Sequence, residues 1–298
     1  KDLDQAGSRF TVNSGIIAQI RRAPLGVVLC MGPYNYPLNE TYTILIPALI
    51  MGNTVVFKPP KLGVLLHCPL LDALREAFPP GVVNTVYGHG PDVIGGMMKS
   101  GKIDVLGFIG SSEVADLLKE QHPKPHRLRC VLGLGAKNPA IILPDADLDL
   151  AVKECVLGSL SYNGQRCTAL KMLFVHTKIA EEFVARFAKA VDDLKCGMPW
   201  EENVQITPLP VPGKPQQLSE LVNEAVAQGA RVVNGGGALI NETLFTPAIL
   251  YPVSANSRIH HVEQFGPVIP IAPFDDLRTP IEWVRQSPYG QQVSLFGT

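Results

Sequence analysis

Short runs of β-branched and apolar residues alternate with longer stretches of helical spacing from residue 25 to about residue 175. Breakers such as Gly52-Asn53 and Pro79-Pro80-Gly81 separate them. The predicted strands are 26–30, 54–57, 82–87 and 103–109, and the predicted helices are 38–51, 64–77, 92–99 and one that starts at residue 113. This alternation is typical of βαβ units, so the pattern predicts an α/β fold with an open parallel sheet.

A second alternating series begins near Asn138. It predicts strands at 140–143, 170–175 and 231–233, and helices that follow the acidic cap 145–149 and cover 179–194 and 216–228. Pro208–Pro215 holds four prolines and predicts an irregular loop. We therefore expect two domains, 1–132 and 133–298. Two further β-rich segments, 8–12 and 15–20, are joined by Asn13-Ser14 and predict a hairpin outside the sheet.

Composition and charge narrow the class of protein. The 298 residues are 46% hydrophobic and 18% charged, with a formal net charge of -1, which is typical of a globular protein and gives no reason to expect a nucleic-acid or membrane partner. No apolar run reaches membrane-spanning length, and the polar opening Lys1–Asp4 does not resemble a signal peptide. The first residue is Lys rather than Met, so we expect a fragment or a processed product.

Cysteine usage points to a reducing compartment. The six cysteines, at positions 30, 68, 130, 155, 167 and 196, form no C-x-x-C pair and no metal-ligand spacing. Scattered thiols in a chain of this size predict a cytoplasmic protein without a metal site.

Cys167 stands directly after Arg166 in the Gly-containing segment Tyr162–Thr168. Nearby positive charge and partial exposure favour the thiolate, which is the nucleophilic form of cysteine. The segment therefore makes Cys167 a candidate nucleophile. The alternative is a small buried apolar side chain, which most free cysteines are.

Five motifs occur in a characteristic order and spacing. They are Tyr34-Asn35-Tyr36-Pro37-Leu38, Val56-Phe57-Lys58-Pro59, Gly110-Ser111-Ser112-Glu113, Gly164-Gln165-Arg166-Cys167 and Glu263-Gln264-Phe265-Gly266-Pro267-Val268. From about residue 8 the chain resembles the aldehyde dehydrogenase superfamily, and most of all its non-phosphorylating, NADP-dependent glyceraldehyde-3-phosphate dehydrogenases. The resemblance implies a Rossmann-like dinucleotide-binding domain, a catalytic cysteine domain, a small hairpin used in oligomerisation, and a homo-oligomer. Family members extend beyond both ends of this chain, so it resembles a truncated member.

The resemblance also implies roles in catalysis. Cys167 would attack an aldehyde to give a thiohemiacetal, which becomes a thioester when hydride leaves. The Asn35 side-chain amide and the Cys167 backbone N–H would stabilise the oxyanion. Without the family, Asn35 is equally well a turn residue before Pro37.

Six residues are implied to bind the cofactor: Lys58 and Lys61 near the adenosine ribose, Gly110 and Ser111 near the pyrophosphate, and Glu263 and Phe265 near the nicotinamide riboside. Many NAD-preferring members carry a glutamate at the position of Lys61. A cation there attracts a 2′-phosphate, which favours NADP, with NAD still possible. The alternative is an exposed loop charge at Lys61.

Substrate binding is implied at Tyr36 and Arg166, which match residues that contact glyceraldehyde 3-phosphate in the subgroup. The planar guanidinium of Arg166 fits a phosphate. A competing interpretation is that Arg166 chiefly favours the thiolate of Cys167, and both can hold.

The general base of the family has no counterpart. Alignment on Lys137 places Gly133 at the position of the usual glutamate, and a register shifted by two places Gly135 there. No Asp or Glu lies between Gln121 and Pro144. A general base contributes ~10²–10⁴-fold, so we expect slow deacylation. Three explanations stay open: a substituted variant, coenzyme A as the acyl acceptor, or a non-catalytic nucleotide-binding fragment.

Overall fold

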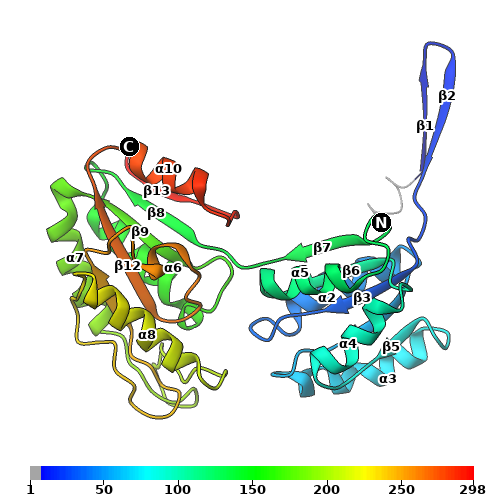
Figure 1. Cartoon of the computed structure of the whole chain (residues 1–298), viewed down its shortest axis with the longest axis horizontal. Helices are drawn as coiled ribbons and strands as arrows, with labels where there is room; N and C mark the ends of the chain where they lie inside the picture. Colours follow the sequence, from blue (N-terminus) through cyan, green and yellow to red (C-terminus); the bar gives the residue numbers. More distant parts are fainter. Residues whose placement is uncertain (1–7) are drawn as a thin grey trace. The chain divides into compact units, whose positions relative to one another are not determined.

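The computed structural model describes residues 8–298. These divide after Leu134 into two compact units, unit 1 before the division and unit 2, Gly135–Thr298, after it (Figure 1). The division falls close to the predicted boundary at residue 132. Within residues 8–298, no helix has both the length and the apolar character needed to cross a bilayer.

Unit 1 contains a five-stranded parallel sheet, which confirms the predicted open α/β fold. The strand order is β5 (Val83–Thr85), β4 (Thr54–Lys58), β3 (Val27–Met31), β6 (Val105–Ile109) and β7 (Arg129–Gly133). The helices are α2 (Asn39–Ile50), α3 (Cys68–Ala77), α4 (Gly90–Lys99) and α5 (Ser112–Gln121). Leu29 and Leu106 pack with α4 and α5, whereas Val28 and Cys30 pack with α2 on the opposite face. This alternation is the period of two that a strand imposes.

Two elements of unit 1 differ from the prediction. The segment predicted as one helix over 64–77 begins with the 3-10 turn η1 (Val64–His67) and continues as α3. Pro69 in the first turn of α3 lacks an N–H, which a helix start tolerates. Strand β7 was not predicted, and it lies where the domain boundary was expected.

A hairpin outside the sheet confirms the prediction for the first described residues (Figure 1). Strand β1 (Ser8–Asn13) pairs antiparallel with β2 (Ile16–Arg21), and Asn13 lies opposite Ile16. The turn is Ser14-Gly15, one residue later than expected. Both residues have positive φ, 49° and 82°, as a tight two-residue hairpin requires.

Unit 2 contains a six-stranded sheet in which only β10 is antiparallel to its neighbour. The strand order is β10 (Arg231–Val232), β11 (Ala248–Tyr251), β12 (Val268–Phe274), β9 (Leu170–His176), β8 (Asn138–Ile142) and β13 (Ser294–Phe296). Helices α6 (Leu148–Leu160) and α7 (Thr177–Asp192) share a core with one face, and α8 (Lys214–Ala227) and α10 (Arg278–Gln286) pack on the other. The short helix α9 (Arg258–His261) precedes β12.

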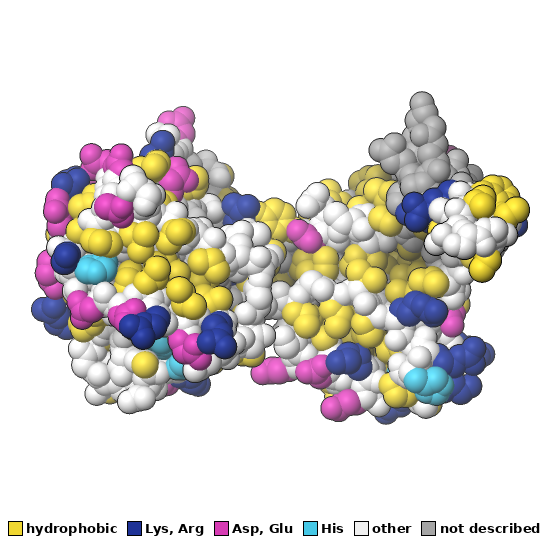
Figure 2. Space-filling view, turned by 90° about the horizontal axis from the view of Figure 1, so that it is seen from above, with side chains coloured by type: hydrophobic (Ala, Val, Ile, Leu, Met, Phe, Trp, Pro, Cys, Tyr) yellow, Lys and Arg dark blue, Asp and Glu magenta, His cyan; other side chains and the backbone are white. Residues whose placement is uncertain are grey.

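The proline-rich segment 208–215 is shorter as a loop than predicted, because α8 begins at Lys214 with Pro215 in its first turn. No elements were predicted after residue 233. The structure shows five there: β11, α9, β12, α10 and β13. On the face drawn in Figure 2, side chains of both charges are interspersed, in keeping with the net charge of -1.

Candidate active site

The predicted cofactor residues of unit 1 gather at the carboxyl ends of its strands. Lys58 is the last residue of β4, and Gly110 and Ser111 follow β6 directly. Asn35 follows β3, and its side chain is 7% exposed. Because the chain runs outward from β3 to β5 and returns at β6, the strand order reverses between β3 and β6. Open α/β sheets bind ligands at the carboxyl ends of the strands at such a point.

Ser111 is the N-cap of α5. Its backbone is extended, and its hydroxyl accepts a hydrogen bond from the backbone N–H of Val114 at 3.4 Å. The N-terminal amides of a helix attract anionic oxygens, so this geometry fits the predicted contact with a pyrophosphate.

Lys58 and Lys61 differ in their surroundings. Lys58 is partly buried, its Nζ donates to the Pro59 carbonyl at 3.3 Å, and burial lowers the pKa of Lys58. Lys61 is exposed on the loop after β4. Tyr36 lies partly buried on the loop that also carries Asn35. The roles of all four residues toward cofactor and substrate stay predictions.

Cys167 lies after a strained turn in unit 2. Tyr162, Asn163 and Gly164 within η2 (Ser161–Gly164) have φ of 59°, 55° and 68°, in the left-handed region. Such conformations cost a non-glycine residue about 1–3 kcal/mol, so the surrounding structure must hold them. Asn163 Nδ2 donates to the carbonyl and hydroxyl of Thr207, and Thr207 N donates back to Asn163 Oδ1 at 3.0 Å.

Two buried side chains hold the backbone of Cys167. Asn138 Nδ2 donates to the Cys167 carbonyl at 2.7 Å, and Lys171 Nζ donates to the same oxygen at 3.2 Å. Asn138 also donates to the Ala169 carbonyl at 3.0 Å. Cys167 as a residue is partly exposed. The nucleophile predicted from the sequence therefore belongs to a partly exposed residue whose backbone carbonyl is held by two buried side chains.

Lys171 also contacts the other predicted motif of unit 2, which begins at Glu263. Lys171 Nζ lies 2.6 Å from Glu263 Oε1 and 5.5 Å from the centre of the Phe265 ring. Glu263 Oε1 also accepts from the Ala136 backbone N–H at 3.1 Å. Burial lowers the pKa of Lys171, whereas Glu263 and Cys167 raise it. The structure thus brings Cys167, Glu263 and Phe265 together, at the amino ends of β9 and β12.

A second buried lysine supports this arrangement. Lys137 Nζ donates to the Ile259 carbonyl and to Gln264 Oε1, both at 2.7 Å. Gln264 Nε2 donates in turn to the carbonyls of Lys171 and Val268. Burial lowers the pKa of Lys137 well below its ordinary value.

Sequence reasoning missed Asn138 and Lys171 as parts of this site, and used Lys137 only to align the motif. The signal was present, since Lys171 interrupts a predicted apolar strand and Asn138 and Lys137 precede another. A polar side chain in a buried strand needs partners, and here the partners are site residues.

The two glycines at the position of the missing base are not equivalent. The three atoms nearest to a Cβ on Gly133, the last residue of β7, all belong to the Ile109 side chain, and the closest lies at 3.1 Å, a tight contact. A Cβ on Gly135 would lie 2.5 Å from Glu263 Oε2. The Glu263 carboxylate already fills the space next to Gly135, so the geometry favours the register that aligns Lys137 and places Gly133 at the base position.

Arg166 borders a cavity of about 660 Å³ in unit 2. Arg166 Nη1 donates to the Ser161 hydroxyl at 3.3 Å, and its buried Nε has no hydrogen-bond partner within the described part of the chain. Thr168 and Gln292 also line this cavity. The cationic guanidinium on the wall of this cavity, one residue before the candidate nucleophile in the sequence, suits an anionic substrate group.

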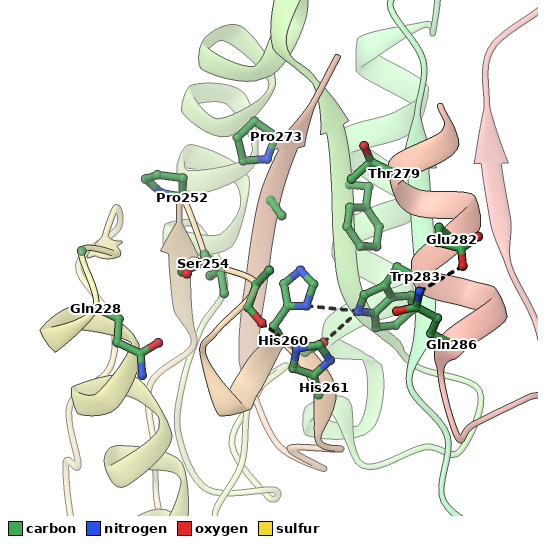
Figure 3. Close-up of a pocket in the computed structure, with 15 residues that line it drawn as sticks. Gln228, Pro252, Ser254, His260, His261, Pro273, Thr279, Glu282, Trp283 and Gln286 are labelled. Carbon is green, nitrogen blue, oxygen red and sulfur yellow. Dashed lines mark hydrogen bonds between the residues drawn. The ribbon is translucent and has the colours of Figure 1, made fainter. Parts of the chain in front are cut away.

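Another cavity of unit 2, about 620 Å³, contains none of the predicted site residues (Figure 3). Trp283 Nε1 donates to His260 Nδ1 at 3.1 Å on its wall. Burial, together with the neighbouring His261 and Lys137, lowers the pKa of His260 to about 4. This histidine is a neutral hydrogen-bond acceptor that packs the cavity wall.

Comparison with known proteins places this geometry in context. Residues 3–298 match the model of the aldehyde dehydrogenase family. The chain is 37% identical to the NADP-dependent glyceraldehyde-3-phosphate dehydrogenase of Streptococcus equinus over 98% of this chain and 60% of that protein. It is 35% identical to human retinaldehyde dehydrogenase 3 over 97% of this chain and 57% of that protein.

Solved structures show the same similarity. The NADP-dependent glyceraldehyde-3-phosphate dehydrogenase of Bacillus halodurans C-125, complexed with NADP, matches with a TM-score of 0.92 at 34% identity, covering 100% of this chain and 63% of that one. The glyceraldehyde-3-phosphate dehydrogenase GapN of Methanocaldococcus jannaschii, also complexed with NADP, matches with a TM-score of 0.92 at 29% identity, covering 100% and 65%. The chain therefore spans about 60% of the length of the curated relatives it matches.

Proposed function

Because the chain belongs to the aldehyde dehydrogenase family, we propose that it oxidises an aldehyde to a carboxylic acid through a thioester on Cys167. The observation that carries the proposal is the setting of this cysteine. The residue is partly exposed, and Asn138 and Lys171 hold its backbone carbonyl. A structural cysteine needs neither a strained turn nor two buried donors on its carbonyl.

The chemistry assigns a task to each residue. The Cys167 thiolate attacks the carbonyl carbon, and the Asn35 amide with the Cys167 backbone N–H stabilises the oxygen that becomes negative. NADP, when bound, accepts the hydride. Water then releases the acid from the thioester, a step for which the usual glutamate is replaced by Gly133.

Two features support NADP as the cofactor. Lys58 and Lys61 lie at the end of β4 and just beyond it, where the adenosine ribose of a dinucleotide reaches the sheet edge. Both lysines are cations, which suits a 2′-phosphate. The relative from Streptococcus equinus is named as NADP-dependent, and two similar solved structures hold NADP.

Glyceraldehyde 3-phosphate is the proposed substrate. Arg166 and Ser161, which are hydrogen-bonded to each other, line a cavity of unit 2, and the Arg166 guanidinium supports a phosphate there. Tyr36 is assigned a further substrate contact. We place the protein in the cytoplasm, as a homo-oligomer that uses the β1–β2 hairpin, whose Phe10, Ile16 and Ile17 are exposed.

The proposal is tested by rapid mixing of the protein with glyceraldehyde 3-phosphate and NADP. A stoichiometric burst of NADPH, absent from Cys167→Ala, is the expected result. If added coenzyme A raises the steady rate and an acyl-coenzyme A forms, coenzyme A rather than water is the acyl acceptor. Binding of NADP without any burst would instead indicate a nucleotide-binding protein that no longer catalyses.

A further inference from the structure

We infer that Lys171 is a positioning residue, which holds the backbone of Cys167 and the carboxylate of Glu263 in place relative to each other. Residue 135 is a glycine because the Glu263 carboxylate lies where a side chain would be. The inference rests on the proposed function, because it gives Glu263 its role toward the nicotinamide riboside. It adds two residues, Lys171 and Gly135, that neither the motifs nor the proposed reaction employ.

Lys171 makes its contacts where the two functional loops of unit 2 meet. One ammonium donates to the carbonyl of Cys167 at 3.2 Å and to Glu263 Oε1 at 2.6 Å. Lys171 is 1% exposed, whereas the Glu263 side chain is 18% exposed. The lysine thus lies wholly inside, and the carboxylate reaches from it toward the surface, where a ligand can approach.

A role in stability alone does not explain this pair. Replacing a buried ion pair by apolar side chains of similar volume is often neutral or stabilising. The same ammonium is hydrogen-bonded to the backbone carbonyl of Cys167 and to the carboxylate of Glu263. Lys171 therefore fixes the backbone that carries the nucleophile while it orients Glu263.

Gly135 completes the arrangement from the other side of the carboxylate. Ala136 N donates to Glu263 Oε1, so Glu263 packs against the 135–136 backbone. A Cβ at residue 135 would lie 2.5 Å from Glu263 Oε2 and 3.5 Å from the Tyr289 ring. An alanine there must displace the carboxylate from its place beside Lys171, whereas the hydrogen bond from Lys171 to the Cys167 carbonyl does not depend on residue 135.

This difference gives two variants with different expected results. Lys171→Met removes the charge from both loops, whereas Gly135→Ala displaces Glu263 and retains the lysine and its hydrogen bond to the Cys167 carbonyl. The matched controls are Lys178→Met, an exposed lysine at the start of α7, and Gly96→Ala, whose added Cβ meets no atom within 4 Å. Thermal unfolding of all four variants shows which of them fold.

Two measurements separate the effects. The first is the alkylation rate of Cys167 by iodoacetamide without cofactor, read from the mass of the peptide that carries it. The second is the dissociation constant for NADPH, from its fluorescence. We expect Lys171→Met to slow alkylation and to weaken NADPH binding, each by about tenfold, since tenfold corresponds to the loss of one charge-assisted contact. Gly135→Ala should weaken NADPH binding to a similar extent while alkylation stays at the wild-type rate.

The inference is overturned if Gly135→Ala binds NADPH as tightly as the wild type, or if folded Lys171→Met is alkylated at the wild-type rate. If Lys171→Met does not fold, Gly135→Ala decides the outcome alone. Failure of the proposed function gives a different result, in which the wild type itself neither binds NADPH nor produces a burst. In that case the alkylation rates still test the contact between Lys171 and Cys167.

Discussion

The carboxylate of Glu263 lies in the space that a side chain at residue 135 would occupy. The distance from an ideal Cβ on Gly135 to Glu263 Oε2 is 2.5 Å, well below any normal contact. At position 133 the three atoms nearest to an added Cβ belong to the apolar Ile109 side chain, the closest at 3.1 Å. The two places where a lost general base could be restored therefore differ in the room available.

Gly133→Glu should raise the steady-state rate, and Gly135→Glu should not. A carboxylate at 133 meets the apolar Ile109 side chain rather than a second carboxylate, and it supplies a base for deacylation, worth ~10²–10⁴-fold. A carboxylate at 135 collides with Glu263 and repels it. The measurement is the steady rate of NADPH formation after the burst, with Gly133→Gln as the control of equal size. Equal rates for Gly133→Glu and Gly133→Gln would show that a missing base does not limit turnover.

Gly164→Ala should destabilise the protein. Gly164 has φ of +68°, and an added Cβ would lie 2.8 Å from the Gly266 carbonyl oxygen and 2.9 Å from that of Ser159. The backbone strain alone costs roughly 1–3 kcal/mol, and neither backbone oxygen can move cheaply. Urea unfolding measures the change, with Gly96→Ala for comparison. A stability equal to that of the wild type would mean that the turn before Cys167 relaxes without cost.

Acidification should destabilise unit 2 through His260. Its pKa is about 4 in the folded chain, compared with 6.5 for an ordinary histidine, because it is buried near His261 and Lys137. Between these two values the unfolded chain binds more protons, so the free energy of unfolding falls as the pH drops from 6.5 to 4. Below pH 4 the folded chain also protonates His260, and the part of the free energy of unfolding that depends on a neutral His260 is lost entirely.

His260→Gln removes that contribution and should flatten the pH dependence of stability over this range. The measurement is urea unfolding at several pH values between 6.5 and 4. His126→Gln, at an exposed histidine, should leave the slope as in the wild type. An unaltered slope for His260→Gln would contradict the assignment.

Lys61→Glu should shift cofactor preference from NADP toward NAD. A carboxylate there repels a 2′-phosphate and can accept a hydrogen bond from a ribose hydroxyl. We expect the ratio of the NADP and NAD dissociation constants to change by at least tenfold, which corresponds to about 1.4 kcal/mol of binding free energy. Titration with each cofactor measures the ratio. Unchanged affinities would show that Lys61 is an exposed loop charge with no role in cofactor binding.

The sequence predicted the fold wherever apolar periodicity was clear. Strands β3, β4, β6, β8 and β9 and their helices were predicted within a few residues, because buried parallel strands give short apolar runs between breakers. The 3-10 start at Val64–His67 was not predicted, since η1 differs from an α-helical turn only in its hydrogen bonds. The C-terminal part after residue 233 was left unassigned, although it contributes β12 to the middle of its sheet.

Only those residues of the candidate site that belong to a recognised motif could be predicted from the sequence. Cys167 and Glu263 belong to motifs, and the structure brings them together. Lys171 and Asn138 belong to none, because their function depends on contacts with residues distant in sequence, such as Glu263. Gly135 was considered as the position of a missing side chain, and only the three-dimensional structure shows that the space beside it is filled by Glu263.

The most direct measurement is the mass of the Cys167 peptide after the protein reacts with glyceraldehyde 3-phosphate and NADP and is quenched in acid. The account predicts a 3-phosphoglyceryl thioester on Cys167, in proportion to the NADPH released in the burst. Cys167→Ala should show neither the adduct nor the burst. Formation of NADPH with Cys167 unmodified at every time point, or by the alanine variant, would contradict the account.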